Sequence, residues 1–491
     1  MFKGAALSNV ITATGLRHIL ILIAAALLLS QMARVIALLV DQDRRALIFP
    51  YSLDYGEGAL LDQSLRLARF EPIYRTDLST PPYIVSNYPP LYPAIQVPFV
   101  WAFGPAYWYG RLISILSSFA AALSIGLLLY RLTADLLAGL TGGLLFLAFP
   151  YVVFWSPLDR IDTLALTLSL LGLLAVVFWG QSHKGIIAGA VLFTAATYTR
   201  QSSLFVAPLS AFVWLWSARL RRNAVELAVI AAALNLGLFI VLDWQTSGGF
   251  YFNIVTANLN EFDWRKVLSS FMEVVLEMPL LIACAVLAVV VGACRLRRRR
   301  PDRAWWVFVP YFAGAIVTAG MVGKIGSNVN YFYELAVALC LAAGVVVALT
   351  HPHGWLPILL VGLALQVGVM VNVSAAWYMF NTSRLLKPEA ELAAIVRVTP
   401  GTVLADEFIG LIPLTGRELY IQPFAQKQLA DAGLWDQTPF VESIRQKKFT
   451  AILLFRNIRQ DRWTAEMLSA IESSYRVDRT VENTDIYLPR Q

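Results

Sequence analysis

Two acidic residues lie in a short glycine-containing motif, Leu53-Asp54-Tyr55-Gly56-Glu57-Gly58, shortly after the first long apolar segment of the chain. A carboxylate in such a loop can act as a general base that deprotonates an acceptor hydroxyl, and a second carboxylate can orient it or bind a metal ion. The same residues also fit an ordinary solvated loop whose acid caps a helix, which is predicted over residues 57–70. The spacing of Asp54 and Glu57 leaves both interpretations open.

A second polar turn, residues 156–162, lies between two apolar segments and carries Asp159, Arg160 and Asp162. Asp162 opens a strongly apolar helix, where a carboxylate also suits the positive end of the helix dipole, so capping and catalysis both remain possible for it. Arg160 is expected to have an anionic partner, because an arginine at a membrane interface is costly without one. That partner is predicted to be Asp159, Asp54 or a phosphate group.

Three turns predicted on the same side of the membrane each supply one base, namely Arg160, Arg200 and Lys324. Each base lies within a residue or two of an apolar helix, at the depth of the lipid headgroups. Three cations in this position could hold a lipid phosphate, with the guanidinium groups forking onto its oxygens. The alternative is that the three side chains simply extend to the lipid headgroups, which is common for long basic residues.

The turn around Lys324 carries further polar residues, including Asn328 and Tyr331, and Glu334 follows just inside the next apolar segment. Backbone and amide groups in this glycine-containing turn could cradle an anion or a sugar, although a plain polar turn explains them nearly as well. Glu334 is a charge within the membrane, so it is predicted to be paired or functional.

The composition indicates that these turns belong to a membrane protein. Of the 491 residues, 58% are hydrophobic and 14% are charged, whereas soluble domains are about 45–50% apolar and about 25% charged. The net charge of +7 arises outside residues 384–491, which hold 14 basic and 14 acidic residues. Bases clustered in loops between apolar segments set membrane topology and do not indicate nucleic-acid binding. The three cysteines all lie in or at the ends of apolar segments, which excludes a disulfide framework.

Apolar runs approaching the length of about 20 residues that crosses a bilayer predict eleven membrane-spanning helices. They cover residues 18–40, 107–130, 133–153, 161–179, 185–199, 203–217, 223–243, 272–294, 304–321, 331–349 and 355–374. The segment 92–104 has only thirteen residues and contains Pro93 and Pro98. It is therefore predicted to be an interfacial helix and not a span.

Eleven spans place the two chain ends on opposite faces of the membrane. One face then collects thirteen bases in short loops: Lys3, Arg17, Arg131, Lys184, Arg219, Arg221, Arg222, Arg295, Arg297–Arg300 and Arg303. By the positive-inside rule this face and the N-terminus are cytoplasmic. The long loops 41–106 and 244–271 and the C-terminal residues are then external, which means periplasmic if the membrane is the inner membrane of a Gram-negative cell.

Residues 384–491 differ in character from the rest of the chain. Helix-like stretches alternate there with short apolar runs at 403–405, 419–421, 451–455 and 486–488, a pattern that predicts a small α/β domain. This segment contains no phosphate-binding loop, zinc motif or nucleophile elbow. The chain is therefore expected to be an α-helical polytopic membrane protein with a small extracytoplasmic α/β domain.

The order of the motifs resembles that of the GT-C superfamily of membrane glycosyltransferases. The acidic motif is followed by Asn87-Tyr88-Pro89-Pro90-Leu91-Tyr92-Pro93, then by Gly104 and Arg111 at the next span, and then by the Arg-x-Asp turn. The chain is most similar to the group that contains protein O-mannosyltransferases and the aminoarabinose transferase of lipid A. The resemblance covers about residues 18–380 and implies a transmembrane catalytic domain over residues 1–380. The separate soluble domain, residues 384–491, is predicted from its own pattern and contributes little to the resemblance.

The resemblance implies an inverting hexosyl- or pentosyltransferase that takes a sugar from a polyprenyl-phosphate carrier and passes it to a hydroxyl of a glycan, lipid or protein. It implies that Asp54 is the base with Glu57 as its partner, that Asp162 is the second acid with Asp159 as its rival, and that Arg160, Arg200 and Lys324 bind the carrier phosphate. Weaker candidates for substrate binding are Tyr88, Asn328, Tyr331 and Glu334. Because Tyr55 and Gly56 separate two acids that are often adjacent in the family, the choice of base between Asp54 and Glu57 stays open, as does a divalent cation held by them.

On this reading, the neighbouring cations should lower the pKa of the catalytic carboxylate, so that it is ionised at neutral pH. Two other functions compete with the enzyme. One is a flippase or transporter of lipid-linked sugars, which should carry charges near mid-bilayer and paired halves; here most charges lie on turns and no internal repeat is evident. The other is a non-catalytic subunit of polysaccharide assembly, which should tolerate neutralisation of Asp54.

Overall fold

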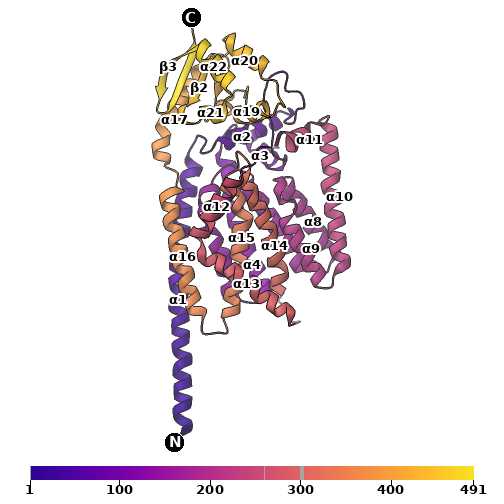
Figure 1. The fold of residues 1–491 in the computed structure, drawn as a ribbon, viewed down its shortest axis with the longest axis vertical. Helices are drawn as coiled ribbons and strands as arrows, with labels where there is room; N and C mark the ends of the chain where they lie inside the picture. The colour runs from indigo at the N-terminus through magenta and orange to yellow at the C-terminus, as the bar shows by residue number, and fades with distance from the viewer. Residues whose placement is uncertain (1, 259, 299–302) are drawn as a thin grey trace.

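The computed structural model describes residues 2–258, 260–298 and 303–491, with side chains from residue 15 onward. The molecule is elongated, with an upright helix bundle that has the N-terminus at one end and the C-terminal residues at the other (Figure 1). Of the thirteen bases predicted to be cytoplasmic, Arg299, Arg300 and the side chain of Lys3 lie outside the described residues.

Eight described helices are long and apolar enough to cross a membrane. They are α1 (Phe2–Ile48), α4 (Trp108–Thr133), α7 (Asp162–Trp179), α10 (Arg221–Gln245), α13 (Pro279–Arg297), α14 (Arg303–Gly320), α15 (Tyr333–Thr350) and α16 (Leu356–Trp377). The remaining predicted spans correspond to α5 (Leu136–Ala148), α8 (His183–Thr197) and α9 (Val206–Ser217), which have 13, 15 and 12 residues. The predicted polytopic α-helical fold is confirmed. The count of eleven stays a prediction, because these three helices are shorter than the usual span of about 20 residues.

Two predicted spans are interrupted at proline residues. The predicted span 133–153 is divided into α5 and α6 (Pro150–Trp155), and the predicted span 272–294 is divided into α12 (Trp264–Glu277) and α13. Pro150 and Pro279 each open the second helix. Proline has no N–H to donate to the preceding turn and forces the residue before it out of the helical conformation, so it begins a helix more easily than it continues one.

Helix α15 lies at the centre of the bundle. All of its residues from Tyr333 to Val347 are buried, and it packs against α5, α13 and α14. A helix that is apolar on every side is expected in such a position. By contrast, only Ala224 and Leu227 are buried in α10, which lies at the edge of the bundle (Figure 1). The turn before α15, which carries Asn330 and Tyr331, is therefore attached to the most firmly packed helix.

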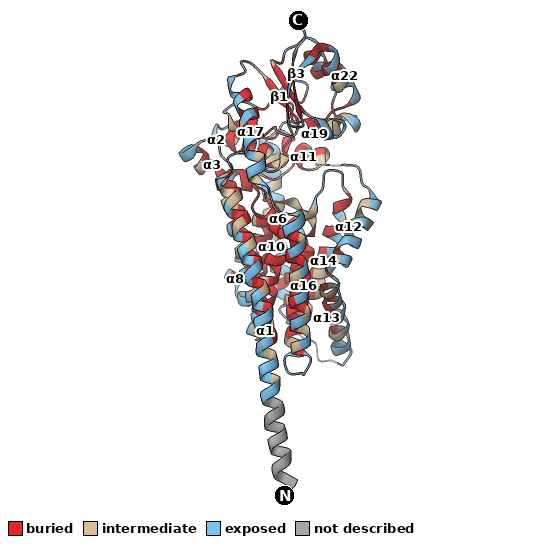
Figure 2. Cartoon of the chain, turned by 90° about the vertical axis from the view of Figure 1, so that its left-hand side faces the viewer, coloured by how far each residue is buried: buried red, intermediate tan, exposed pale blue. Residues whose placement is uncertain are grey.

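Two short helices of the first long loop cover the end of the bundle. Helix α2 (Tyr55–Ala68) follows the acidic motif and packs against α3 (Leu91–Phe103). Figure 2 shows both at the end of the bundle near the C-terminal residues, with α3 outside the group of long helices. The interfacial location predicted for residues 92–104 stays a prediction.

The C-terminal residues form a four-stranded sheet in the order β1-β2-β4-β3. Its strands are β1 (Val403–Ala405), β2 (Ala451–Phe455), β3 (Tyr475–Val481) and β4 (Thr484–Pro489), of which β1 and β2 are parallel and the other pairs antiparallel. Helices α17 (Thr382–Val398), α18 (Leu411–Leu414), α19 (Pro423–Asp431), α20 (Thr438–Arg445), α21 (Arg459–Arg462) and α22 (Ala465–Ser474) surround the sheet. The small α/β fold is confirmed, whereas the predicted run 419–421 is not a strand of this sheet. The boundary near residue 380 stays a prediction.

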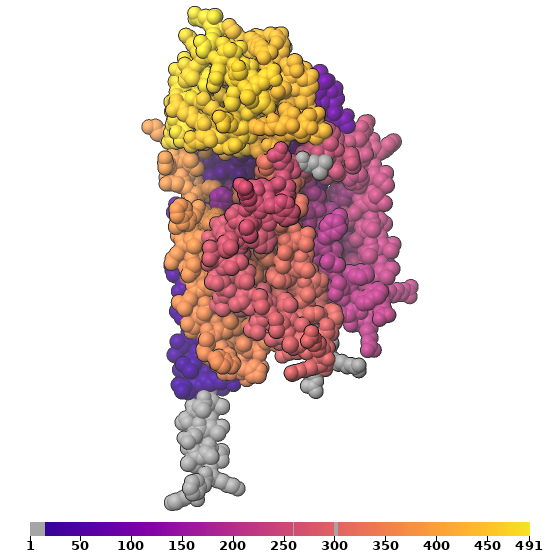
Figure 3. Space-filling model, in the orientation of Figure 1, coloured from indigo at the N-terminus to yellow at the C-terminus, as the bar shows by residue number. Residues whose placement is uncertain are grey.

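The C-terminal fold and the first loop are joined by backbone contacts. Tyr83 exchanges two backbone hydrogen bonds with residues 420 and 422, at 2.7 and 2.9 Å, and Tyr107 Oη donates to the carbonyl of Gly410 at 2.8 Å. Gly58 of α2 lies so close to Gly410 that a Cβ on Gly58 would be 2.5 Å from the Gly410 Cα. Figure 3 shows the C-terminal residues resting on the bundle, with a hollow beneath them on this face.

Candidate active site

Asp54 begins the acidic motif and caps α2. Its Oδ2 accepts a hydrogen bond from the Gly56 N–H at 2.8 Å, which is the usual role of an aspartate before the first helical turn. The same oxygen lies 3.2 Å from Nη1 of Arg160, and 24% of the Asp54 side chain is exposed. Oδ1 has no hydrogen-bond partner among the described residues. Both interpretations of Asp54 are therefore compatible, because the cap occupies one oxygen and leaves the other available.

Glu57 is fully buried and connects separate segments of the chain by hydrogen bonds. It accepts two hydrogen bonds from the Arg111 guanidinium, at 2.9 and 2.8 Å, one from the Leu53 N–H at 2.6 Å and one from the Asp159 N–H at 2.7 Å. These four donors use the acceptor capacity of a carboxylate. Glu57 thus fixes the acidic loop to the turn 156–162 and has no free oxygen lone pair for a substrate.

Arg111 is the partner that sequence reasoning did not assign to Glu57. Its guanidinium is fully buried and also donates to the carbonyls of Ala46, Phe49 and Tyr51, at 2.6, 2.6 and 2.5 Å. It therefore joins the end of α1 and the loop after it to the start of α4. In the sequence Arg111 appeared only as a basic residue opening a span, because nothing local indicates an acid 54 positions earlier.

Asp162 contacts polar side chains from several segments around the second turn. It is the first residue of α7 and is buried, with Trp155 Nε1 at 2.6 Å, Asn330 Nδ2 at 2.8 Å and Arg200 Nη1 at 3.0 Å from its oxygens. Nε of Arg160 lies 4.0 Å away. Asp162 therefore brings Arg160 and Arg200 together, as the shared external face predicted.

The two arginines have further partners that are aromatic. Arg160 donates to Tyr88 Oη at 3.3 Å and its guanidinium lies over the Trp155 and Tyr88 rings, while the Arg200 guanidinium lies 4.6 Å from the centre of the Tyr331 ring. Stacked guanidinium groups keep their edges free for oxygen ligands. Nε of Arg160 is buried and has no hydrogen-bond partner in the described part of the chain.

Other predicted residues have separate partners. Lys324 Nζ donates to the backbone carbonyl of Asn258 at 2.7 Å and also contacts the side-chain oxygen of that residue, and burial lowers the pKa of the Lys324 ammonium. Asn328 accepts from the Val329 N–H at 2.7 Å, as a helix cap, and Glu334 is paired with the Tyr311 hydroxyl. None of these three has a direct contact with Asp54 or Asp162 among the described residues. Of the three cations that were predicted together, Arg160 and Arg200 thus lie in one cluster, and Lys324 is bound elsewhere.

The pKa of Asp54 is shifted in the direction opposite to the one expected from the sequence. Burial raises the pKa of its carboxyl above the ordinary value, and the opposing effect of Arg160 is smaller. The prediction of a lowered pKa was wrong because the sequence indicates nearby cations but not the loss of solvent. The neighbouring Asp159 is also affected, since burial and the charge of Glu57 raise its pKa to about 7.

Asp159 lies behind the acidic loop and not in the open part of the site. Its Oδ1 accepts from Tyr92 Oη and from Gln96 Nε2, each at 2.9 Å, so it connects the turn to α3. Arg160, which could have paired with it, pairs with Asp54 and Asp162 instead. Of the partners that the sequence left open for Arg160, the structure shows Asp54 and not Asp159, and it adds Asp162, which was not among them.

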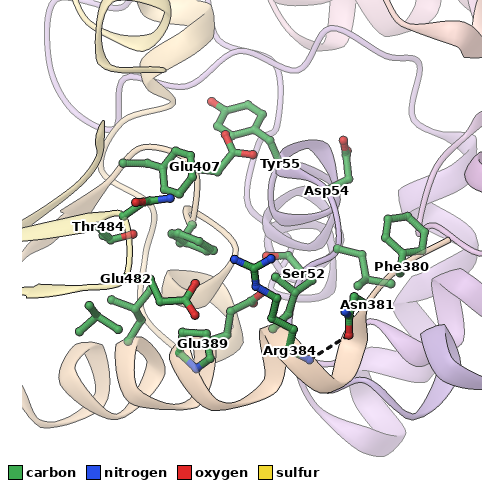
Figure 4. A pocket seen from close by; sticks show the side chains of 18 of the residues that line it. Ser52, Asp54, Tyr55, Phe380, Asn381, Arg384, Glu389, Glu407, Glu482 and Thr484 are labelled. Carbon is green, nitrogen blue, oxygen red and sulfur yellow. Dashed lines mark hydrogen bonds between the residues drawn. The ribbon is translucent and has the colours of Figure 1, made fainter. Parts of the chain in front are cut away.

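A cavity of about 430 Å³ lies between the acidic loop, α17 and the C-terminal sheet. Residues 52–55 line one side, and residues 481–484 of the turn between β3 and β4 line another. Figure 4 shows Asp54 at its edge. Its volume is within the range of small-molecule sites, about 300–1,000 Å³, so one edge of a substrate-sized space is formed by a carboxylate with a free oxygen.

The carboxylates of the acidic motif do not fit a divalent cation. Such an ion needs several oxygen ligands, and both Glu57 oxygens are already occupied by Arg111 and two backbone N–H groups. The described residues contain no group of three or more histidine, cysteine, aspartate or glutamate side chains arranged to hold a metal ion. The predicted pair of metal ligands at Asp54 and Glu57 is thus unsupported by their geometry.

Comparison with solved structures identifies proteins of the same fold. The chain is similar to the crystal structure of ArnT from Cupriavidus metallidurans bound to undecaprenyl phosphate, with a TM-score of 0.65 and 14% identity over 92% of this chain and 97% of that one. It is also similar to the oligosaccharyltransferase AglB from Archaeoglobus fulgidus in complex with an inhibitory peptide and a dolichol phosphate, with a TM-score of 0.54 and 10% identity over 95% of this chain and 74% of that one. The sequence matches no protein-family model and no curated protein.

The predicted likeness to GT-C glycosyltransferases is confirmed at the level of the fold. Both neighbours were solved with a polyprenyl-type phosphate. Another structure of the archaeal enzyme, at a TM-score of 0.51, contains zinc and sulfate. At identities of 10 to 14%, what these proteins share with this chain is the fold.

Proposed function

We propose that this chain is an inverting glycosyltransferase of the membrane. It transfers a hexosyl or pentosyl group from a polyprenyl-phosphate carrier to an acceptor hydroxyl at the extracytoplasmic face. The observation that carries the proposal is the position of Asp54, which has one oxygen bound to Arg160 at 3.2 Å and the other free at the edge of the cavity. The fold similarity to two transferases solved with carrier phosphates supports the choice of donor.

In the proposed reaction Asp54 accepts the proton of the acceptor hydroxyl. The oxygen of that hydroxyl forms a bond with the anomeric carbon, and the bond from that carbon to the phosphate oxygen breaks with its electron pair staying on the phosphate. Attack from the side opposite the phosphate inverts the anomeric centre. The raised pKa of Asp54 suits this role, since a stronger base takes the proton more readily.

Arg160 and Arg200 are proposed to bind the phosphate. Charge accumulates on the leaving oxygen in the transition state, and cations already fixed in a water-poor site stabilise it strongly. Asp162 holds both guanidinium groups in place. In this assignment Asp162 and Glu57 are positioning residues and Asp54 is the catalytic residue. Lys324 has the weakest claim to the phosphate, because its ammonium is bound to Asn258.

The proposed orientation follows the distribution of bases in the sequence. The N-terminus is cytoplasmic, and the acidic loop, the cavity and the C-terminal sheet are extracytoplasmic. In a Gram-negative cell the chain would be a multi-pass protein of the inner membrane. The acceptor hydroxyl would then come from a glycan, lipid or protein outside the cytoplasm.

The test is carrier release in proteoliposomes. A panel of polyprenyl-phosphate sugars is presented to the wild-type protein and to Asp54→Asn, and free polyprenyl phosphate is measured. Asp263→Asn is a matched control, because Asp263 also caps a helix by accepting from a backbone N–H two residues on, at 2.8 Å, but lies outside the cluster. Release by wild type and Asp263→Asn but not by Asp54→Asn is expected.

Two outcomes would count against the proposal. Equal release by Asp54→Asn would remove this residue as the base. The absence of release from every donor, with added acceptors and folded protein, together with movement of the lipid-linked sugar across the bilayer, would favour a flippase. Addition of EDTA is expected to leave release unchanged, in line with the occupied oxygens of Glu57.

A further inference from the structure

We propose that Arg462 of the C-terminal fold is a positioning residue for Asp54, on which it acts through Tyr55 and Glu407. The inference rests on the proposed function, because it concerns the base of the reaction assigned to Asp54. Arg462 is the last residue of the short helix α21, which lies in the C-terminal fold and far from the acidic motif in sequence.

The Arg462 guanidinium stacks on the side chain that directly follows Asp54. Its central carbon lies 4.1 Å from the centre of the Tyr55 ring and 5.1 Å from the centre of the Phe424 ring. Tyr55 is the first residue of α2, which Asp54 caps by accepting from the Gly56 N–H. A guanidinium group over an aromatic ring is attracted by the negative face of that ring. The stack therefore holds the first helical residue of α2, and with it the direction of the Asp54 side chain just before it.

Two further contacts hold the same end of α2 against the C-terminal fold. Phe424 meets Tyr55 edge-on, with the ring centres 6.4 Å apart. One helical turn later, a Cβ on Gly58 would lie 2.5 Å from the Gly410 Cα, so the two backbones touch. Because Arg462 is the charged member of this group of contacts, replacing it changes both the packing and the electrostatics at the acidic motif.

Arg462 also neutralises a carboxylate that acts on Asp54. Its Nη2 donates to Oε2 of Glu407 at 2.7 Å, and the two side chains are only 16% and 31% exposed, so solvent screens their charges in part. Glu407 lines the cavity together with Asp54 and Tyr55, and Figure 4 shows these three residues along one side of that space. Burial is the main cause of the raised pKa of Asp54, and the negative charge of Glu407 adds to it. The guanidinium of Arg462 offsets that charge.

The other charged groups that face Asp54 belong to different elements. Arg160 of the turn 156–162 pairs with it and lowers its pKa, and Glu57 of α2 raises its pKa. Three more charged side chains line the same cavity: Arg384, Glu389 and Glu482. None of these five forms an ion pair with Arg462 in the part of the chain that the structure describes. A change at Arg462 is therefore expected to act on Asp54 through Tyr55 and Glu407.

The test is the pH profile of carrier release by full-length protein in proteoliposomes. Arg462→Met leaves Glu407 charged and unpaired, so the acid limb of kcat/KM is expected to move to higher pH. Adding Glu407→Gln removes that negative charge, so the acid limb of the double variant is expected to return to the wild-type position or below it. In both variants kcat on the alkaline plateau is expected to fall ~10-fold or more with little change in the KM for the donor, because a small misplacement of a base slows the reaction strongly.

Arg459→Met is the matched control. Arg459 lies on the same short helix, pairs with Asp485 and lies 5.8 Å from the centre of the Tyr487 ring. It therefore makes the same two kinds of contact as Arg462, but with partners inside the C-terminal fold. This variant is expected to keep the acid limb and the kcat of wild type.

If Arg462→Met does not fold, Glu407→Gln alone provides the test, and its acid limb is expected at lower pH than that of wild type. Acid limbs that do not move, a shift as large in Arg459→Met, or a double variant that keeps the shift of Arg462→Met would overturn the inference. Release that depends on Asp54, with unmoved acid limbs in these variants, would refute only the role of Arg462. Absence of release by wild type would refute the proposed function and this inference with it.

Discussion

The two acids of the acidic motif each form an ion pair, Asp54 with Arg160 and Glu57 with Arg111, and the two pairs have different surroundings. The pair of Glu57 and Arg111 is fully buried, with 0% of either side chain exposed, whereas 24% of Asp54 and 11% of Arg160 are exposed. The first pair uses every oxygen of its carboxylate, and the second leaves Oδ1 of Asp54 free. The two acids of the motif therefore have different roles in the proposed site: Glu57 fixes the loop, and Asp54 faces the substrate. The first three predictions below test this division from the largest expected effect to the smallest.

Replacing Asp54 should have the largest effect on activity. Asp54→Asn is expected to lower the rate of transfer by about 10²–10⁴-fold, the usual contribution of a general base. Asparagine is also a good helix cap, so the melting temperature should change little. The measurement combines carrier release with thermal unfolding in detergent. A large drop in melting temperature would show that Asp54 mainly stabilises the loop and would contradict the division.

Breaking the buried pair should have the largest effect on stability. Arg111→Met leaves Glu57 charged without a partner, which costs about 3–5 kcal/mol for a buried pair. Adding Glu57→Gln removes that charge, so the double variant is expected to unfold at a higher temperature than Arg111→Met alone. Equal melting temperatures of wild type and Arg111→Met would show that this pair does not hold the loop.

Arg160, which belongs to the partly exposed pair with Asp54, and the neighbouring Arg200 should both affect binding of the donor. Arg160→Ala and Arg200→Ala are each expected to raise the KM for the donor by about 10- to 100-fold, since a hydrogen bond to a charged group contributes about 1.5–3 kcal/mol. Lys324→Ala is expected to raise it less, because Lys324 is bound to Asn258. The kinetics of carrier release provide the measurement, and an equal effect of all three variants would restore the predicted triad of cations.

The pH dependence should show the smallest effect. Asp54 is active as a base when deprotonated, so kcat/KM should rise with pH through its pKa, and burial places that pKa above the ordinary aspartate value of about 3.9. Arg160 lowers the pKa, so Arg160→Gln should move the acid limb to higher pH. A profile measured for both proteins tests the sign, and a shift to lower pH would contradict it.

The sequence predicted well what depends on apolar length and on shared faces. Long apolar segments have few alternatives in a membrane, so the bundle and the joint position of Asp54, Arg160, Asp162 and Arg200 were predictable. Arg-x-Asp also placed Arg160 and Asp162 on one turn. The small C-terminal sheet was recognisable from its short apolar runs.

The features that escaped prediction depend on contacts distant in sequence. The partnership of Glu57 with Arg111 joins two loops, and no local pattern favours it over other pairs. The direction of the Asp54 pKa depends on how much solvent is excluded, and that depends on how segments distant in sequence pack around the loop. The breaks at Pro150 and Pro279 were visible as prolines, but apolar length outweighed them in the prediction of continuous spans.

The close approach of Gly58 and Gly410 has a consequence for engineering. The segment that carries Asp54 and the C-terminal fold that covers the cavity are in backbone contact at these two glycines. Each segment therefore forms part of the surface on which the other packs. A chimera that exchanges only the C-terminal 108 residues for those of another protein would have to reproduce a contact with no side chain on either partner. The exchangeable module is therefore the C-terminal fold together with the first long loop, two segments distant in sequence that would have to be transplanted as one.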